Sequence, residues 1–265
     1  MSTAISELHE LDDLEELEGV FTAVWGRTEV PAINSDILKA LAHSGNYVVG
    51  AREGKRLVGG LVGWLGGMPP DQLHLHSHIL GVVAGNQVRG LGFSLKQHQR
   101  EWCLARGVKV VEWTTDPLVR RNAYFNLTKL GAEADAYLVN FYGEMADGLN
   151  AGGESDRLVI RWHLDSPRSV AAASGHAGET TVDNLVRDGA VAVLTEGAQR
   201  EPVSHPGSAR VLLCRVPEDI VAVRRSDPVL ARAWRMALRR TLMDALGAGF
   251  RVSGATRSGW YVLER

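Results

Sequence analysis

Several features that define other classes of protein are missing from this sequence of 265 residues. It has two cysteines, Cys103 and Cys214, which lie too far apart for a disulfide framework or a zinc pattern and are expected to be buried, reduced thiols. The formal net charge is −2, so no basic excess favours nucleic acid or an anionic membrane as a partner. No run of eighteen apolar residues occurs, and the first residues are acidic. We therefore expect a cytoplasmic protein without a signal peptide or a transmembrane span.

Two common phosphate-binding motifs are also incomplete. The mononucleotide P-loop requires a Gly-Lys-Ser/Thr ending, which this sequence lacks. The dinucleotide fingerprint requires a third glycine three residues after Gly92, where the sequence has Leu95. Neither a P-loop nucleotidase nor a Rossmann dinucleotide enzyme is therefore expected.

A strand, a glycine loop and a helix nevertheless follow one another in the middle of the chain. The apolar run 79–83 leads into residues 87–92, and a helical pattern begins at Phe93. Gly90 and Gly92 have no side chain that would keep a ligand from the backbone, and a helix start directs N–H groups towards an anion. Two basic residues lie in or after this loop, Arg89 and Lys96. The segment therefore predicts a phosphate-binding site, with a glycine turn between core elements as the alternative.

The loop resembles the acyl-CoA loop of the GNAT N-acyltransferase superfamily, whose pattern is Gln/Arg-x-x-Gly-x-Gly/Ala. Gln87, Gly90 and Gly92 match it in order, and Val82 stands where that superfamily usually has a valine. The resemblance implies an acyl-CoA co-substrate. We expect no metal, because no carboxylate or cysteine pattern suitable for one lies near the histidines of the preceding strand. The residues that the resemblance implies for acyl-CoA binding are Val82, Val83, Gln87, Val88, Arg89, Gly90, Leu91, Gly92 and Phe93.

The order of the predicted elements supports this resemblance. The first predicted element is an amphipathic helix over 8–24, whose leucines recur at three- and four-residue steps. A short helix over 37–43, which Asn34-Ser35-Asp36 can cap, and a hairpin of strands 47–52 and 56–65 come next. The remaining elements are the strand 73–83, the helix 93–106, the strand 108–114, a helix from Asp116-Pro117 to Leu130, and the strands 137–142 and 158–164. This order is that of the GNAT fold, an α/β (α+β) fold with a mixed, mostly antiparallel sheet flanked by helices. We expect this catalytic domain to occupy residues 1–165.

The remainder of the chain is expected to form an accessory lobe. Residues 166–180 are rich in Ser, Ala, Gly and Pro and predict a linker. Residues 181–265 predict a strand, a long helix that begins at Asp227-Pro228, and a final hairpin. Arg232, Arg235, Arg239 and Arg240 are expected on a solvated face of that helix. Such a small lobe is expected to pack on the first domain or to pair with another subunit, so a homodimer is one expected assembly.

Three histidines alternate along the strand that enters the loop: His74, His76 and His78. Period two places them on one face, and imidazoles titrate near neutral pH. The resemblance places a base near His78, which is the first candidate to deprotonate an amine, with His76 second. Two alternatives remain open, namely hydrogen bonding within a polar sheet face and a shared metal ion.

The helix that ends at Gly131 resembles the second CoA-binding motif of the superfamily, with one departure. The superfamily's usual tyrosine, which acts as an acid towards the CoA thiolate, is replaced by Leu127. Tyr124 lies one turn earlier on the same face and is the candidate acid, with a packed aromatic as the alternative. Asn122 and Asn126 are candidates for binding the CoA arm. Asp116 is expected to cap the helix.

These features predict an N-acyltransferase that moves an acyl group from acyl-CoA to a primary amine of a small molecule or amino acid by direct attack. Acetyl is the first expectation for the acyl group, and succinyl is the second, by analogy alone. The alternative is a non-catalytic acyl-CoA-binding or sensing module, which the missing tyrosine motivates. A nucleotide-binding protein is a weaker third hypothesis.

Overall fold

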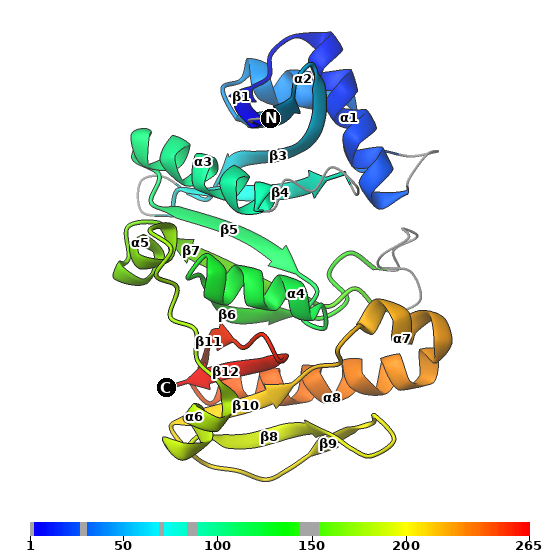
Figure 1. Ribbon diagram of the computed structural model, residues 1–265, viewed down its shortest axis with the longest axis vertical. Helices are drawn as coiled ribbons and strands as arrows, with labels where there is room; N and C mark the ends of the chain where they lie inside the picture. The colour runs from blue at the N-terminus through cyan, green and yellow to red at the C-terminus, as the bar shows by residue number, and fades with distance from the viewer. Residues whose placement is uncertain (1–2, 27–30, 69–71, 84–89, 144–153) are drawn as a thin grey trace. The chain divides into compact units, whose positions relative to one another are not determined.

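The computed structural model describes residues 3–26, 31–68, 72–83, 90–143 and 154–265 (Figure 1). The chain divides into two compact units. One contains Met1–Trp113, and the other contains Thr114–Ala146 and Asn150–Arg265. Each unit is described by itself below.

The sheet of the first unit contains strands in the order β1-β2-β3-β4-β5. The strands are β1 (Thr3–Glu7), β2 (Tyr47–Glu53), β3 (Arg56–Gly66), β4 (His74–Val82) and β5 (Val110–Thr115), of which the first four residues of β5 belong to this unit. Neighbours from β1 to β4 are antiparallel, and β4 and β5 are parallel. The sequence did not predict β1, because this short polar stretch becomes a strand only through its pairing with β2.

Three helices accompany this sheet: α1 (Leu11–Trp25), α2 (Ser35–His43) and α3 (Leu91–Ala105). Leu14, Leu17 and Phe21 of α1 are fully buried in one core with Val48 and Val62 of the sheet. This apolar stripe is the one predicted from the spacing of leucines. The side chain of Asn34 accepts a hydrogen bond from the Ile37 N–H at 3.0 Å and so caps α2, as predicted.

Strand β4 is irregular at His78 and parts from β5 near its middle. Ile79 lies opposite Val62 and Ser77 opposite Gly63, so His78 is an extra residue in a β-bulge. Among the described residues, β4 pairs with β5 only through Leu75 with Val111 and His76 with Glu112. From Ser77 onwards, the side of β4 that faces away from β3 is therefore an open strand edge within this unit.

The sheet of the second unit has the order β7-β6-β11-β12-β10-β8-β9. Its strands are β6 (Glu133–Leu138), β7 (Arg157–His163), β8 (Val191–Glu196), β9 (Pro202–Ser204), β10 (Val211–Arg215), β11 (Arg251–Ala255) and β12 (Trp260–Glu264). Val252 of β11 pairs with Ala134 of β6, so the C-terminal strands continue the sheet that the β6–β7 hairpin begins. The strands β8 and β9 were not predicted.

The helices of the second unit differ from the sequence prediction in several places: one predicted helix begins later than expected, and three short helices, over 167–173, 182–187 and 220–226, were not predicted. They are α4 (Arg120–Ala123), the π-helical turn η1 (Tyr124–Lys129), α5 (Pro167–Ala173), α6 (Val182–Arg187), α7 (Ile220–Ser226) and α8 (Pro228–Gly247). The predicted helix from Asp116-Pro117 to Leu130 begins only at Arg120 and widens into η1. The predicted linker 166–180 contains α5, which begins because the Ser166 side chain accepts the Ser169 N–H at 3.2 Å and Pro167 follows.

The predicted α/β fold with a mixed, mostly antiparallel sheet and flanking helices is confirmed. The two cysteines are buried free thiols, Cys103 in α3 and Cys214 in β10, as expected. In the described part of the chain, every helix is too short or too polar to span a bilayer.

Candidate active site

The predicted acyl-CoA loop falls partly outside the described residues, because Gln87, Val88 and Arg89 are not among them. Gly90 is described and has φ +91°, a left-handed conformation that favours glycine. A Cβ atom at Gly90 would meet nothing within 4 Å, so the start of α3 is open on this side.

The first N–H groups of α3 are available to a ligand. No side chain caps the helix, and the first backbone hydrogen bond runs from the Ser94 N–H to the Gly90 oxygen at 2.9 Å. Within the described ranges, the N–H groups of Leu91, Gly92 and Phe93 have no acceptor. A helix start with free N–H groups and the positive end of the helix dipole suits a phosphate.

The open edge of β4 offers backbone groups next to this helix start. The Val83 N–H donates to the Val58 oxygen of β3 at 2.9 Å. Because N–H groups alternate in direction along an antiparallel strand, the N–H of Val82 points away from β3. Val82 can therefore pair with an extended chain of amides in the way that an edge strand pairs with a peptide.

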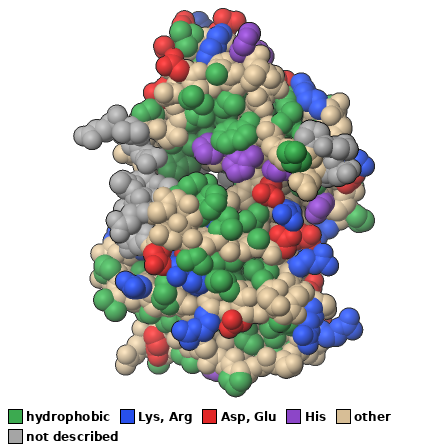
Figure 2. Space-filling view, turned by 180° about the vertical axis from the view of Figure 1, so that it is seen from behind, with side chains coloured by type: hydrophobic (Ala, Val, Ile, Leu, Met, Phe, Trp, Pro, Cys, Tyr) green, Lys and Arg blue, Asp and Glu red, His purple; other side chains and the backbone are tan. Residues whose placement is uncertain are grey.

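Two of the three histidines gather around Trp64 of β3. The ring centroids of His76 and His78 lie 5.0 Å and 4.6 Å from that of Trp64, and 5.9 Å from each other. Histidine side chains gather on the face shown in Figure 2, and His78 is exposed while His76 is partly buried. His74 turns its Nδ1 towards the Gln72 oxygen at 3.0 Å instead.

Both imidazoles beside Trp64 are neutral at pH 7. Although part of the His78 side chain reaches solvent, the groups packed around its ring desolvate the imidazole, and this desolvation together with the charge of His76 lowers its pKa to about 4. Burial also lowers the pKa of His76, while the nearby Glu112 carboxylate opposes that shift. A neutral imidazole has a free lone pair and can accept a proton from an amine or from water.

Lys96 does not add a surface charge to the loop. Its side chain is 3% exposed, and its Nζ donates to the Ser77 Oγ at 2.9 Å and to the Gln99 Oε1 at 3.0 Å. The Nζ also lies 3.8 Å from the ring centroid of Trp113 in β5. Lys96 thus bridges β4 and β5 where the two strands part, and burial lowers the pKa of its ammonium group to about 7.

In the second unit, the hydroxyl of Tyr124 donates a hydrogen bond to the Glu179 carboxylate. The side chains of Lys129 and Arg257 also approach the Tyr124 ring, at 5.9 Å and 5.2 Å from its centroid. Burial and the bond to Glu179 raise the pKa of Tyr124, so its phenol keeps its proton at neutral pH. Of the two asparagines of this region, Asn122 is exposed and Asn126 is buried.

The expectation of a solvated arginine face on α8 is wrong for Arg235. Its side chain is buried and donates to both carboxylate oxygens of Asp116 at 2.9 and 3.0 Å, while Arg224 of α7 donates to the same carboxylate. Asp116 is therefore no helix cap; its Oδ1 accepts the Leu118 N–H at 3.0 Å, two residues before α4 begins. Burial alone would raise the pKa of Asp116, but the two guanidinium groups hold it well below its ordinary value.

Sequence reasoning missed the roles of Lys96 and of the Asp116–Arg235 pair. A lysine in the first turns of a helix that follows a glycine loop suggests a phosphate contact, and nothing local shows that it is buried. Asp116 and Arg235 are 119 residues apart, so no spacing rule connects them. The only sequence signal that Arg235 is buried was its position in α8 beside residues of the apolar stripe, such as Trp234 and Leu238.

No group of three or more His, Cys, Asp and Glu side chains in the described ranges is arranged to hold a metal ion.

No curated protein matches this sequence. The chain resembles the ribosomal-protein-S18-alanine N-acetyltransferase of Escherichia coli with 14% identity and a TM-score of 0.50, over 62% of this chain and 96% of that one. It is also similar to Arabidopsis thaliana Naa50, with 18% identity and a TM-score of 0.46 over 61% of this chain and 98% of that one. A third similar structure is an aminoglycoside acetyltransferase from an uncultured soil metagenomic sample, with 23% identity and a TM-score of 0.39 over 43% of this chain and 78% of that one.

The first of these likenesses shows the fold, and a protein-family model supplies the family. Residues 9–131 match the model of the acetyltransferase (GNAT) family, a region that extends from α1 through β4, α3 and β5 to η1. It includes the glycine loop, the histidine strand and Tyr124, on which the sequence prediction depended. Residues 9–131 therefore form a domain of the acetyltransferase (GNAT) family.

Proposed function

We propose that the chain transfers an acetyl group from acetyl-CoA to the primary amine of a small molecule or amino acid by direct attack, with succinyl as the second candidate for the acyl group. The observation that carries this proposal is the arrangement of β4 in the first unit. An open strand edge at Val82, free N–H groups at the start of α3 and two neutral imidazoles lie along one strand and the helix that follows it.

The diphosphate of CoA binds at Gln87–Phe93 in this proposal, and the free N–H groups of Leu91, Gly92 and Phe93 are the described part of that site. The pantetheine amides pair with β4. Because the Val83 N–H already donates to Val58, the pairing falls to Val82. The open space beside Gly90 supports the same placement, since a ligand can reach the backbone there.

His78 is the proposed base, with His76 as the second candidate. The bulge at His78 interrupts the pairing of β4 with β3, and its side chain is exposed. Its neutral imidazole takes the proton of the amine, directly or through a water molecule, as the amine nitrogen forms its bond to the acyl carbon. The CoA thiolate leaves, and we propose the protonated phenol of Tyr124 as its proton donor. Asn122 and Asn126 are proposed to bind the CoA arm.

Substitution of each histidine tests these roles. We expect His78→Ala to lower kcat by about a hundredfold or more, because general-base catalysis contributes that much, while the Kd for CoA is unchanged. His76→Ala is the parallel test, and His74→Ala is the matched control on the same strand, since its ring is bound to Gln72. If kcat and its pH dependence are the same in His78→Ala as in the unsubstituted protein, His78 is not the base.

The loop assignment has an independent test. Gly90→Leu should abolish CoA binding, because the added side chain fills the open space at the start of α3. Gly107→Leu is the control, because Gly107 follows α3, has φ +74° and is also surrounded by open space. This control carries the same backbone strain without touching the loop. A normal Kd for CoA in Gly90→Leu would contradict the assignment.

One observation favours a second candidate, an acyl-CoA-binding sensor without turnover. Leu127 replaces the usual tyrosine, and the hydroxyl of Tyr124 is bound to Glu179. A thiol-release assay with a panel of primary amines separates the two candidates. Release of CoA with any amine supports the transferase, whereas tight CoA binding without release for every amine supports the sensor.

A further inference from the structure

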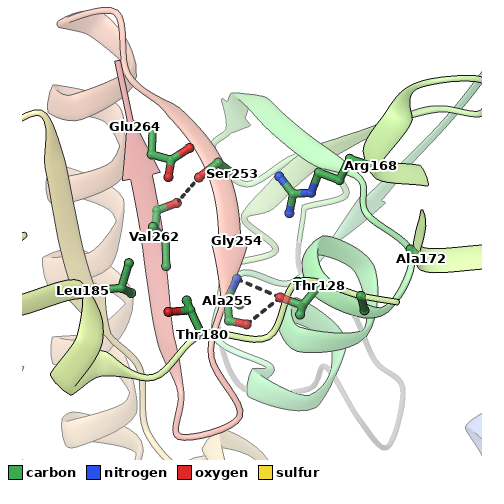
Figure 3. A pocket seen from close by; sticks show the side chains of 12 residues that line it. Thr128, Arg168, Ala172, Thr180, Leu185, Ser253, Gly254, Ala255, Val262 and Glu264 are labelled. Atoms are coloured by element: carbon green, nitrogen blue, oxygen red, sulfur yellow. Dashed lines mark hydrogen bonds between the residues drawn. The ribbon is translucent and has the colours of Figure 1, made fainter. Parts of the chain in front are cut away.

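A pocket of about 260 Å³ lies within the second unit, between η1, α5 and the strands β11 and β12 (Figure 3). The segment between α5 and α6 closes one side of it through Gly178 and Thr180. None of its lining residues is among those proposed above to bind acyl-CoA or to act on it. The pocket therefore has no role in the acyl transfer as proposed.

Two opposite charges face each other across this pocket. The Arg168 guanidinium of α5 and the Glu264 carboxylate of β12 point towards one another from opposite sides in Figure 3. Partial burial of its guanidinium group lowers the pKa of Arg168, and the charges of Glu264 and, to a smaller extent, Glu133 oppose that shift, so Arg168 and Glu264 interact across the space. Arg168 donates to the Leu127 oxygen, and in the described part of the chain no ion pair joins it to Glu264.

The rest of the lining is partly apolar and partly hydroxylic. Ala172, Leu185 and Val262 provide aliphatic surface. Thr180 and Ser253 provide hydroxyl groups, and the Ser253 hydroxyl donates to the Val262 oxygen at 3.3 Å, which leaves its own oxygen as an acceptor. The pocket thus combines one cation, one anion and an aliphatic wall.

We propose that this pocket binds a free aliphatic α-amino acid, with its carboxylate on Arg168, its ammonium group on Glu264 and its side chain against Leu185 and Val262. A guanidinium group binds a carboxylate through two parallel hydrogen bonds, and a carboxylate accepts those of an ammonium group. The volume of about 260 Å³ accommodates a small amino acid.

The pocket also has a connection to Tyr124. Gly178 and Thr180 flank Glu179, whose carboxylate accepts hydrogen bonds from Tyr124 and Arg257. An amino acid in the pocket contacts the segment that carries this carboxylate. The bound ligand is therefore placed to influence the helix η1, on which Tyr124 and Thr128 lie.

Calorimetric titration of the full-length protein without acyl-CoA tests the proposal. The probes are L-valine, isovalerate, which lacks the ammonium group, and isobutylamine, which lacks the carboxylate. We expect L-valine to bind at least tenfold more tightly than either analogue, because each analogue leaves one charged group of the pocket without its partner. Equal binding of the three probes, or no heat with L-valine up to about 10 mM, would overturn the proposal.

Variants distinguish this pocket from the acceptor site. Arg168→Gln and Glu264→Gln should each weaken L-valine binding at least tenfold, while His78→Ala leaves it unchanged. Arg251→Gln is the matched control, because Arg251 lies on β11 outside the lining and its side chain is 66% exposed. Circular dichroism confirms that each variant is folded, and the conservative Glu264→Gln keeps the test valid if Arg168→Gln does not fold. Loss of binding in His78→Ala with retention in both pocket variants would place the amino acid at the acyl-transfer site and refute the proposal.

Discussion

Replacing Lys96 with methionine removes an ammonium group from the interior of the first unit while preserving most of the side-chain volume. Lys96 is 3% exposed and lies between Ser77, Gln99 and Trp113. Burial lowers its pKa from 10.5 to about 7. Between pH 7 and pH 10.5 the unfolded chain therefore carries a proton on Lys96 that the folded chain has lost.

The size of the effect follows from this difference in pKa. A change of one pKa unit corresponds to about 1.4 kcal/mol, so lowering the pKa from 10.5 to about 7 corresponds to about 5 kcal/mol. Since the unfolded state binds more protons in this range, the free energy of unfolding contributed by Lys96 rises with pH from 7 to about 10.5. The slope approaches about 1.4 kcal/mol per pH unit. Lys96→Met has no such group, so its stability lacks this rise.

Urea unfolding of the two proteins at several pH values between 6 and about 10 measures the difference. The other titrating groups are common to both proteins, and the thiol of Cys103 beside Lys96 has a pKa that burial raises to about 12, above this range. The lost hydrogen bonds to Ser77 and Gln99 change the difference by a constant and leave its slope unaffected. Lys55→Met is the matched control, because Lys55 is exposed in the turn between β2 and β3.

We expect the stability of Lys96→Met relative to the unsubstituted protein to be greatest at and below pH 7 and to decrease steadily above it. The control should show no such trend. Parallel stability curves for the unsubstituted protein and Lys96→Met would refute the reasoning, since they would mean that Lys96 keeps an ordinary pKa in the folded state.

Three further substitutions have effects that can be read from single contacts. Asp116→Asn should lower the free energy of unfolding in urea by about 3–5 kcal/mol, because it leaves Arg235 and Arg224 without their carboxylate. Since the pKa of Asp116 is lowered in the folded state, this stabilisation is present above pH ~4 and is lost as the pH falls further. A cost below about 1 kcal/mol at pH 7 would contradict the buried ion pair. Thr128→Val should lower the free energy of unfolding by about 1–3 kcal/mol in the same measurement. The Thr128 hydroxyl donates a hydrogen bond to the Ala255 backbone oxygen at 2.6 Å and accepts one from the Ala255 N–H at 3.3 Å, and valine can make neither. An unchanged unfolding midpoint would exclude these hydrogen bonds. Gly67→Ala should lower the thermal unfolding midpoint strongly, because its Cβ atom would lie 1.9 Å from the Gln72 backbone oxygen at a residue whose φ is +85°. Gly54→Ala is the control for backbone strain alone, because Gly54 has φ +61° and open space where a Cβ atom would lie. Equal midpoints for the two variants would refute the clash at Gly67.

Local patterns were sufficient where neighbours in the chain determine the structure. The leucine spacing of α1, the cap at Asn34 and the glycine at the start of α3 are formed by residues within a turn or two of each other, and each is confirmed. Period two correctly brought His76 and His78 to one side of β4, beside Trp64. The resemblance to the GNAT loop could be recognised for the same reason, since it depends on residues that are neighbours in the chain.

The environment of the charged groups was decided only by the tertiary structure. The sequence alone determined that a strand, a glycine loop and a helix follow one another, and that histidines precede them. Only the folded chain decided that Lys96 lies buried beside Trp113, that Arg235 meets Asp116 across 119 residues, and that Arg168 and Glu264 face each other across a pocket. The physical reason is that the burial of a charge depends on partners brought from distant segments, and no local periodicity records them.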